Sequence, residues 1–440
     1  MRILLFSPLL LEQYLQGYKS HWKTFLHRII LKGSYHRSLS LEMLAAVTPK
    51  KHEVVIRKEY YKNVNYDEDF DIIGIRTTTT DSFFAYKVAD EFRRQKVPVV
   101  LGGWHASALP EEAKQHADAV VIGEAEETWP KLLNDFENGR LKPFYRPERP
   151  VDPKNIPAAN SFFSKDFAPA IQASRGCPYQ CEFCSETIMN SKKIFRPRPV
   201  ENVVEEIKSI PGNVFVFHDA SLTIDPKYTK KLFRSMIDLN KHFFCNGNVD
   251  TLGSDDELLS IAKKAGCVGW LIGFESISKE SLIGAGKKTN NVNSYMNAIE
   301  KIHEHNMMVS GSFVFGFDGD TLDIFDKTKD FVDMSGIDMP DAMTLTPFPG
   351  TPLFNRLEKE GRILTKDWSK YDHHHVVFQP KNMTPEDLFE NTQKIYADFF
   401  SKYSMAKRIL KSIKLGYNPF ISVLFQNLTM ATMETNVELK

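Results

Sequence analysis

The sequence predicts an α/β fold with two parallel-sheet domains, a linker between them and a helical C-terminal region. Short apolar runs alternate with helical segments in two separate stretches, which is the pattern of βα units and parallel sheets. A stretch rich in proline and charge, KPFYRPERPVDPKNIPAA at 142–159, separates them, and it suits neither a helix interior nor a central strand. The 440 residues also exceed one typical core.

The first domain, placed at residues 1–145, is predicted to be a doubly wound, Rossmann-like parallel sheet. Between its third and fourth strands, the apolar residues of SFFAYKVADEFRRQK recur at helical spacing. Ligands of such sheets bind at the carboxyl ends of the strands, so we expect a site at the turns 77–80, 102–107 and 123–127. The predicted strands are Ile3–Phe6, Glu53–Ile56, Ile72–Ile75, Pro98–Leu101 and Ala119–Ile122.

The second domain, placed at 166–364 after a linker at 146–165, is predicted to be a partial or complete βα barrel. Its active face should be the carboxyl end of the strands. Residues 365–440 show a helical, less regular pattern. The predicted strands are Ala168–Ala173, Val214–Phe217, Phe243–Val249, Val268–Ile272, Met308–Phe315 and Ala342–Leu345.

Composition excludes several classes of protein. A chain that is 42% hydrophobic and 25% charged is typical of globular proteins. Lys plus Arg equals Asp plus Glu at 56 each, so we expect no nucleic-acid partner. Only five cysteines occur, which favours a reducing cytoplasm over a disulfide framework. The sequence contains no run of about 18 consecutive apolar residues, so no membrane-spanning helix is predicted.

Three cysteines follow the first strand of the second domain in the sequence SRGCPYQCEFCSE. Cys177, Cys181 and Cys184 have CxxxCxxC spacing, which can wrap three thiolates around one metal centre. Three ligands on a four-iron cluster leave one iron open to bind another molecule. A structural zinc or an electron-transfer cluster needs four ligands, and Cys245 and Cys267 lie apart from the motif.

This motif closely resembles that of the radical S-adenosylmethionine (SAM) superfamily. Further matches in order and spacing are FHDASLT (217–223), AGCVGWLIGFES (265–276), GSFVFGFDGDT (311–321) and TPFPGTPLFNRL (346–357). The resemblance implies a [4Fe–4S] cluster on the three cysteines, whose open iron binds SAM. It also implies reductive cleavage of SAM to a 5′-deoxyadenosyl radical and an electron donor such as ferredoxin or flavodoxin.

The same resemblance implies SAM contacts at the strand ends. Glu275 would contact the ribose or methionine end, Gly311 and Gly316 would flank the adenine, and Asp219 would lie at the same mouth. Alternatively, the acids cap helices and the glycines only permit close packing. We favour the SAM contact for Glu275 and leave Asp219 open.

The first domain resembles the cobalamin-binding domain of the B12-dependent radical SAM class through VVLGGWHASALPEE, ADAVVIGEAEETWPKLL and GRLKPFY. The resemblance implies cobalamin between the two domains. No DxHxxG motif is present, so we expect no cobalt-ligating His by that route. His105 would touch the corrin edge or cap its turn, and loss of the cofactor stays an alternative. The candidate contacts are Thr77, Thr78, Thr79, Thr80, Gly102, Gly103, His105, Gly123 and Glu124.

These observations together predict cobalamin-dependent radical methylation of an unactivated carbon. Two alternatives stay open: a non-methylating radical oxidation, cyclisation or coupling, and a non-catalytic iron–sulfur or cobalamin-binding module. The 32 Phe residues and the apolar tail favour a hydrophobic small molecule or lipid as substrate.

Three further features have more than one interpretation. Arg196 and Arg198 would bind the SAM carboxylate or face water, and we favour water. The run His373–His375 is treated as loop or interface residues, because adjacent side chains point apart. The tail, 407–430, would rest peripherally on a membrane through its lysines and apolar run or, as we favour, pack on the barrel.

Overall fold

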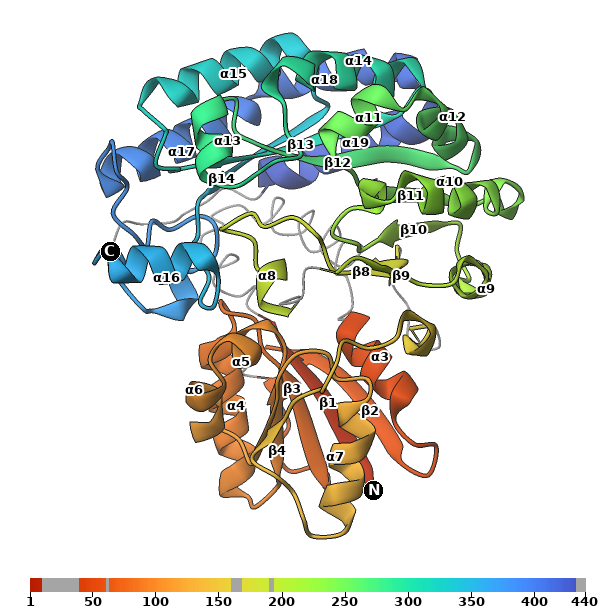
Figure 1. Cartoon of the computed structure of the whole chain (residues 1–440), viewed down its shortest axis with the longest axis vertical. Coiled ribbons are helices and arrows are strands. Elements are labelled where there is room, and N and C mark those ends of the chain that lie inside the picture. The colour runs from red at the N-terminus through yellow and green to blue at the C-terminus, as the bar shows by residue number, and fades with distance from the viewer. Residues whose placement is uncertain (10–38, 61–62, 160–167, 190–193, 433–440) are drawn as a thin grey trace.

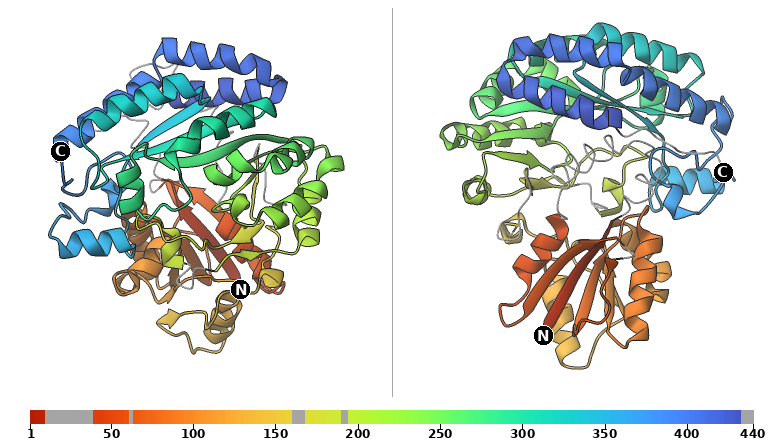
Figure 2. Two further views of the ribbon diagram at one scale, coloured as in Figure 1. Left: turned by 45° about the horizontal axis from the view of Figure 1, so that its top comes forward. Right: turned by 180° about the vertical axis from the view of Figure 1, so that it is seen from behind.

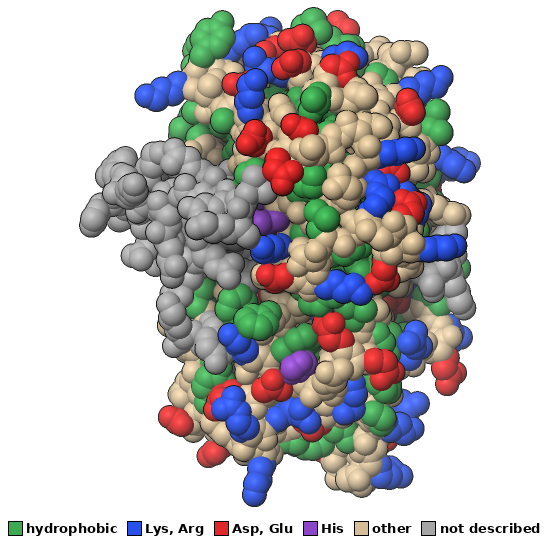
Figure 3. Space-filling view, turned by 90° about the vertical axis from the view of Figure 1, so that its left-hand side faces the viewer, with side chains coloured by type: hydrophobic (Ala, Val, Ile, Leu, Met, Phe, Trp, Pro, Cys, Tyr) green, Lys and Arg blue, Asp and Glu red, His purple; other side chains and the backbone are tan. Residues whose placement is uncertain are grey.

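The computed structural model describes residues 1–9, 39–60, 63–159, 168–189 and 194–432. Two α/β domains lie one above the other, and the C-terminal helices cover the second domain on the side away from the first (Figure 1). Positive and negative side chains are interspersed over the face shown in Figure 3, as expected for a chain of zero formal net charge.

The first domain is a parallel sheet in the order β2-β1-β3-β4-β5-β6. Its strands are β1 (Arg2–Pro8), β2 (Glu53–Glu59), β3 (Ile72–Arg76), β4 (Val99–Gly102), β5 (Ala119–Val121) and β6 (Phe144–Tyr145). The five predicted strands are therefore confirmed. The two-residue β6 is an addition within the proline-rich stretch, at a sheet edge where flanking prolines are tolerated.

Helices cover both faces of this sheet, so β1 is buried on both sides. Ile3 and Leu5 share one core with Trp129 of α7, whereas Leu4 and Phe6 share the other with Phe92 of α4. This is the doubly wound arrangement that near-continuous apolar strands predict. The helices are α3 (Leu39–Val47), α4 (Ser82–Arg94), α5 (Trp104–Ala108), α6 (Pro110–Gln115) and α7 (Thr128–Glu137); η2 (Pro153–Asn155) follows.

The second domain contains a parallel sheet in the order β14-β13-β12-β11-β10-β7. Among the described strands, the terminal β7 and β14 do not pair, so the barrel is partial. An antiparallel ribbon of β8 (Ser174–Arg175) and β9 (Arg196–Pro197) was not predicted. The sheet strands are β7 (Ala170–Ile171), β10 (Val214–Phe217), β11 (His242–Asn246), β12 (Cys267–Glu275), β13 (Met308–Phe315) and β14 (Met339–Thr344).

Helix α8 (Glu186–Met189) follows the cysteines and lies between the two domains (Figure 1), whereas the other helices between these strands pack outside the sheet (Figure 2). They are α9 (Val200–Ser209), α10 (Pro226–Arg234), α11 (Val249–Ser254), α12 (Asp256–Lys264), α13 (Lys279–Gly284), α14 (Tyr295–Glu304) and α15 (Asp323–Ser335). Short 3₁₀ turns are η4 (Leu222–Ile224), η5 (Ile237–Leu239) and η6 (Val292–Ser294).

The remaining chain is helical, as predicted. It forms α16 (Pro352–Lys359), η7 (Trp368–Lys370), α17 (Pro385–Phe399), α18 (Lys402–Ser412), η8 (Ile413–Leu415) and α19 (Tyr417–Thr432). A capping box between Thr384 and Asp387 starts α17, whose apolar face joins the barrel core through Ile395 and Phe399. No helix in the described chain combines the length and the apolar character needed to cross a membrane.

Candidate active site

The cysteine loop runs from Cys177 to Cys184 and is held at Glu182 by backbone hydrogen bonds to two other parts of the domain. The Glu182 N–H donates to Ala285 O after α13 (3.0 Å), and Glu182 O accepts from the Leu353 N–H in α16 (2.9 Å). A tight turn joins Cys184 N to Cys181 O at 3.1 Å. The two bonds of Glu182 hold the loop against elements more than 90 residues away in the sequence.

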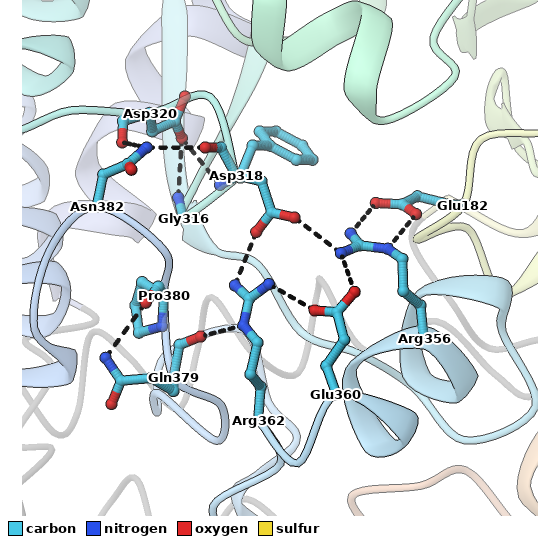
Figure 4. Close-up of polar contacts among 11 residues, drawn as sticks. Glu182, Gly316, Asp318, Asp320, Arg356, Glu360, Arg362, Gln379, Pro380 and Asn382 are labelled. Atoms are coloured by element: carbon cyan, nitrogen blue, oxygen red, sulfur yellow. Dashed lines mark hydrogen bonds and ion pairs between the residues drawn. The ribbon is translucent and has the colours of Figure 1, made fainter.

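Arginine side chains from α16 and the following turn add a polar network to this loop (Figure 4). Arg356 makes a bidentate contact with Glu182, at 2.7 Å and 3.1 Å, and reaches Asp318 at 2.7 Å. Arg362 contacts the other oxygen of Asp318 at 2.7 Å. The network therefore ties the cysteine loop to the turn that follows β13.

Burial raises the pKa of all three thiols, that of Cys184 to about 11. A buried thiolate needs positive charge nearby, which a bound metal supplies. In the described chain, no three His, Cys, Asp or Glu side chains converge on the position of one metal ion. The cysteines of a four-iron cluster bind different irons, so wider spacing suits them. Cys245 and Cys267 are buried in the core at β11 and β12.

Glu275 lies at the end of β12 in a strained conformation, with φ of 61° and a shift in strand register beside it. Its carboxylate contacts the ammonium of Lys287 at 2.7 Å. A Cβ on Gly273 would lie 2.3 Å from Glu275 Oε1, so this glycine makes room for the carboxylate. Lys287 was not predicted from the sequence, because a lysine twelve positions after its partner carries no local signal.

Lys287 is also close enough to act electrostatically on the cysteines. Burial by itself would lower the pKa of Lys287, but Glu275 and Cys181 outweigh burial, so the pKa is raised. In return, Lys287 lowers the pKa of Cys177, Cys181 and Cys184, although burial prevails there. The strand end at Glu275 and the cysteine loop thus form one electrostatic unit.

Asp219 lies at the same end of the barrel, but its carboxylate is occupied by the chain leading to the cysteines. It accepts hydrogen bonds from the backbone N–H groups of Ala173 (3.1 Å) and Ser174 (2.5 Å), and from the Ser174 hydroxyl. Burial raises its pKa to about 6, although these bonds oppose the shift. The geometry indicates that Asp219 positions the segment leading to the cysteines, and its contact with SAM stays a prediction.

The two predicted glycines of β13 lie in tightly packed places. A Cβ on Gly311 would lie 3.0 Å from the Phe274 ring, and one on Gly316 would lie 2.8 Å from Leu388. Gly316 has φ of 107°, and its N–H donates to Asp320 at 2.9 Å. Both glycines thus have a packing role, and contact with adenine stays a prediction.

A cavity of about 470 Å³ lies between the carboxyl ends of the first sheet and the start of the second domain. The predicted cobalamin contacts Gly102, Gly103, Gly123 and Glu124 line it. The second domain contributes Arg175 and Gly176, which directly precede the cysteine loop, Glu186, which follows it, and Arg196. The cavity therefore lies next to the predicted cluster site.

Thr77, Thr79 and His105 are buried, and Thr78 and Thr80 are partly buried. None of these five residues lines the cavity. The Thr77 hydroxyl donates to Gly102 O, and the ring of His105 lies 3.1 Å from Glu112. The carbonyl of Thr77 would lie 2.5 Å from a Cβ on Gly103, so these residues shape the turn that carries the lining glycines.

Ion pairs between residues that line the cavity join the first domain to the second. Glu124 contacts Arg196 at 2.5 Å and 3.0 Å and Arg175 at 3.5 Å, and Arg175 also pairs with Glu126. Burial alone would raise the pKa of Glu124, but Arg196 and Arg175 outweigh burial and lower it. The Val151 N–H donates to the same carboxylate at 2.7 Å.

The expectation that Arg196 and Arg198 face water was wrong. Arg196 is held by Glu124, and Arg198 is 2% exposed and contacts Glu206 at 2.6 Å. Arg196 lies within, and Arg198 directly after, an element that the sequence did not reveal, the β8–β9 ribbon, and both side chains contact acidic partners. An alternation of arginine and proline gives no signal of such partners.

The histidine run forms a turn closed by Asp372. Its carboxylate accepts from the backbone N–H groups of His374 and His375, and lies 2.9 Å from the His375 ring. His373 has φ of 67°, and its carbonyl accepts from the Thr344 N–H at the end of β14. The run is thus a loop beside the barrel mouth, as interpreted from the sequence.

Comparison with known proteins matches three stretches of the chain to families. Residues 171–332 match the radical SAM superfamily, 32–133 the B12 binding domain, and 351–437 a domain of unknown function (DUF4070). Bacteriochlorophyllide d C-12(1)-methyltransferase of Chlorobaculum tepidum is 30% identical over 414 residues, which are 90% of each chain. The chain belongs to the cobalamin-dependent radical SAM enzymes.

Two further comparisons agree with this family. Bacteriochlorophyllide d C-8(2)-methyltransferase of the same organism is 31% identical over 412 residues, covering 87% of this chain and 88% of the relative. The cobalamin-dependent SAM radical enzyme OxsB, solved with aqua-cobalamin and SAM, has a TM-score of 0.69 at 14% identity and covers 96% of this chain and 70% of its own. The predicted family, fold class and enzymatic nature are therefore confirmed.

The cofactors of this radical SAM enzyme are a [4Fe–4S] cluster, SAM and cobalamin, and the geometry fits them. Glycines line the cavity and keep its wall low: a Cβ on Gly102 or Gly123 would reach only ordinary van der Waals contact, with no neighbour closer than 3.7 Å. Buried Glu126 Oε2 and Arg196 Nε, both on lining residues, have no hydrogen-bond partner within the described chain. A flat ring system bearing polar groups matches such a cradle.

Proposed function

We propose that this enzyme transfers a methyl group to an unactivated carbon of a hydrophobic small molecule or lipid. The observation that carries the proposal is the cavity between the domains, which is lined by strand ends of the B12-binding sheet and by residues flanking the cysteine loop. One site can therefore serve both cofactors. The relatives' names indicate the tetrapyrrole class as the first substrates to test.

The bound cofactors would supply one-electron cleavage of SAM and a transferable methyl group, while the protein's part is placement. Cys177, Cys181 and Cys184 would hold the cluster, and Lys287 would keep Glu275 in place beside it. The pairs of Glu124 with Arg196 and Arg175 hold the two domains together around the cavity. Closure of that kind excludes water from reactive species.

The test uses the full chain, purified anaerobically and reconstituted with iron and sulfide, then given hydroxocobalamin, methyl-deuterated SAM and a strong reductant. We expect bound cobalamin in the visible spectrum and, with a bacteriochlorophyllide acceptor, a product heavier by one deuterated methyl group. Each turnover should consume two SAM and two electrons and release 5′-deoxyadenosine, methionine and S-adenosylhomocysteine in equal amounts.

Matched cysteine variants separate the outcomes. Cys181→Ala should abolish both SAM-derived products, whereas Cys245→Ala, in the core, should retain the cluster and both products. Formation of 5′-deoxyadenosine without S-adenosylhomocysteine would instead support the non-methylating alternative. Neither product from the intact cluster with an acceptor present would contradict the proposal.

A further inference from the structure

The outer surface of the C-terminal helices is apolar although nothing in the described chain covers it. Helices α18 and α19 lie side by side at the end of the molecule away from the first domain (Figure 2, right). At the turn between them, Leu410 is 66% exposed, Ile413 57% and Tyr417 77%. We name residues 410–417 the hairpin tip. The exposed row continues along α19 through Ile421, Phe425 and Leu428.

The opposite face of the hairpin is firmly packed, so the exposed row is not a sign of loose docking. Arg408 is buried and contacts Asn427 Oδ1 at 3.0 Å and 2.8 Å, and Asn427 donates to Asp338 O at 3.0 Å. Val423 and Leu415 lie in the main core of the second domain. Each helix thus has a buried stripe and an apolar exposed stripe, an arrangement that marks an interaction surface.

The charged side chains on these two helices have one sign. Residues 399–432 contain five Lys or Arg and no Asp or Glu. Lys402, Lys411 and Lys414 are exposed, and within the described residues no acidic side chain forms an ion pair with them. Lys411 and Lys414 lie within the hairpin tip itself, next to its apolar side chains.

A second copy of the chain is a poor occupant for this surface. In a two-fold dimer the same patch meets itself, so Lys411 and Lys414 would face their own copies across the contact. Like charges at an interface cost several kcal/mol. An anionic lipid surface meets both properties at once: its acyl boundary takes up the apolar side chains and its headgroups attract the lysines.

We propose that the hairpin tip binds the surface of a bilayer containing anionic lipids. The apolar residues Leu410, Ile413 and Tyr417 would enter the headgroup region, with Lys411 and Lys414 at the phosphates. The cavity between the domains lies at the far end of the second domain and stays accessible. This proposal is independent of methyl transfer, because it concerns a surface outside the cavity.

The test is co-sedimentation of the full chain with vesicles of phosphatidylcholine alone or mixed with phosphatidylglycerol. We expect binding to the mixed vesicles that weakens as salt rises, and little binding to phosphatidylcholine. Reversing two charges with Lys411→Glu and Lys414→Glu should weaken binding by about tenfold or more, from about 1 kcal/mol per surface lysine. The apolar triple variant Leu410→Ser, Ile413→Ser, Tyr417→Ser should abolish it.

Matched controls alter exposed residues elsewhere: Lys208→Glu with Lys264→Glu, and Ile283→Ser, should bind as the original chain does. The variant Tyr417→Trp provides a check that does not rely on loss of binding. The fluorescence of the added tryptophan should shift to the blue and be quenched by brominated lipid with mixed vesicles only. No association with either vesicle, or equal loss in the controls, would overturn the proposal. A dimer that the triple variant converts to a monomer would assign the surface to a second copy instead.

Discussion

Lys287 is the residue whose charge acts on all three cysteines of the loop. It is held by Glu275, whose own backbone is strained at φ of 61°. Strain of this kind persists where the surrounding structure fixes a residue for function. The pair therefore places one positive and one negative charge at fixed positions beside the predicted cluster.

Lys287→Met should make a bound cluster harder to reduce, because a buried positive charge near the thiolates favours the added electron. The midpoint potential measured by redox titration with electron paramagnetic resonance should become more negative. The exposed neighbour Lys288→Met is the matched control and should leave the potential unchanged. Equal potentials in all three proteins would show that Lys287 only anchors Glu275.

Glu124 gives the contact between the domains a dependence on pH. Its pKa in the folded protein is lowered, because the arginines outweigh burial. The stabilisation is therefore complete above the unfolded value of about 4.5 and is lost as pH falls through the folded pKa. Glu124→Gln leaves Arg196 without its charged partner and should cost roughly 3 kcal/mol at pH 7.

Thermal unfolding from pH 7 down to about pH 3, below the ordinary pKa of a glutamate, checks this expectation. The original chain should lose more stability over that range than Glu124→Gln, since the variant has already lost the pair. Glu148→Gln, an exposed change in the same domain connection, serves as the control. Parallel pH curves for Glu124→Gln and the original chain would contradict the assignment.

At the scale of elements, α16 acts as a clamp on the cysteine loop. The N–H of Leu353, near the start of α16, donates to Glu182 O. Arg356, one turn later, binds the Glu182 carboxylate. The loop itself is short and contains no helix or strand, so its shape depends on such external contacts.

Arg356→Ala should therefore accelerate removal of iron by a chelator from the reconstituted protein. The change in unfolding free energy should be only about 1 kcal/mol, because Arg356 is partly exposed and its pairs are screened. Lys359→Ala, on the exposed side of the same helix, should leave the rate of iron loss unchanged. An unaltered rate in Arg356→Ala would show that backbone contacts alone hold the loop.

At the scale of the whole molecule, the first domain contacts both of the other regions. The first domain and the second are joined by the Glu124 pairs, and the C-terminal region reaches the first domain through Trp368, whose indole N–H donates to Glu112 at 3.1 Å. Binding of a large cofactor in the cavity should therefore stabilise the regions that these contacts join.

Hydroxocobalamin at a hundred times its Kd should raise the free energy of unfolding by about 2.7 kcal/mol. Gly102→Leu should remove this stabilisation, because its side chain would extend into the cavity from a position with room for a Cβ. Differential scanning calorimetry with and without cobalamin measures the effect. Gly212→Leu, in an open surface turn, is the control, and equal stabilisation of both variants would place cobalamin elsewhere.

The sequence by itself determined the parallel strands, the family and the position of the cysteine motif. Each depends on a pattern within a few residues: apolar runs for β1 and β10, and CxxxCxxC spacing for the loop. The assignment of the cysteines as cluster ligands stays a prediction, which the Cys181→Ala variant tests. The two-residue strands β6, β8 and β9 escaped because their pairing, not their composition, defines them.

Only the tertiary structure decided which charged residues are partners. Glu124 and Arg196 are 72 positions apart, and Lys287 lies near Cys181 only because α13 returns the chain to the cysteine loop. It also showed that His105 is buried and does not line the cavity. Such pairs form when two sheets and their connecting helices pack, and that long-range packing leaves no periodic trace in the sequence.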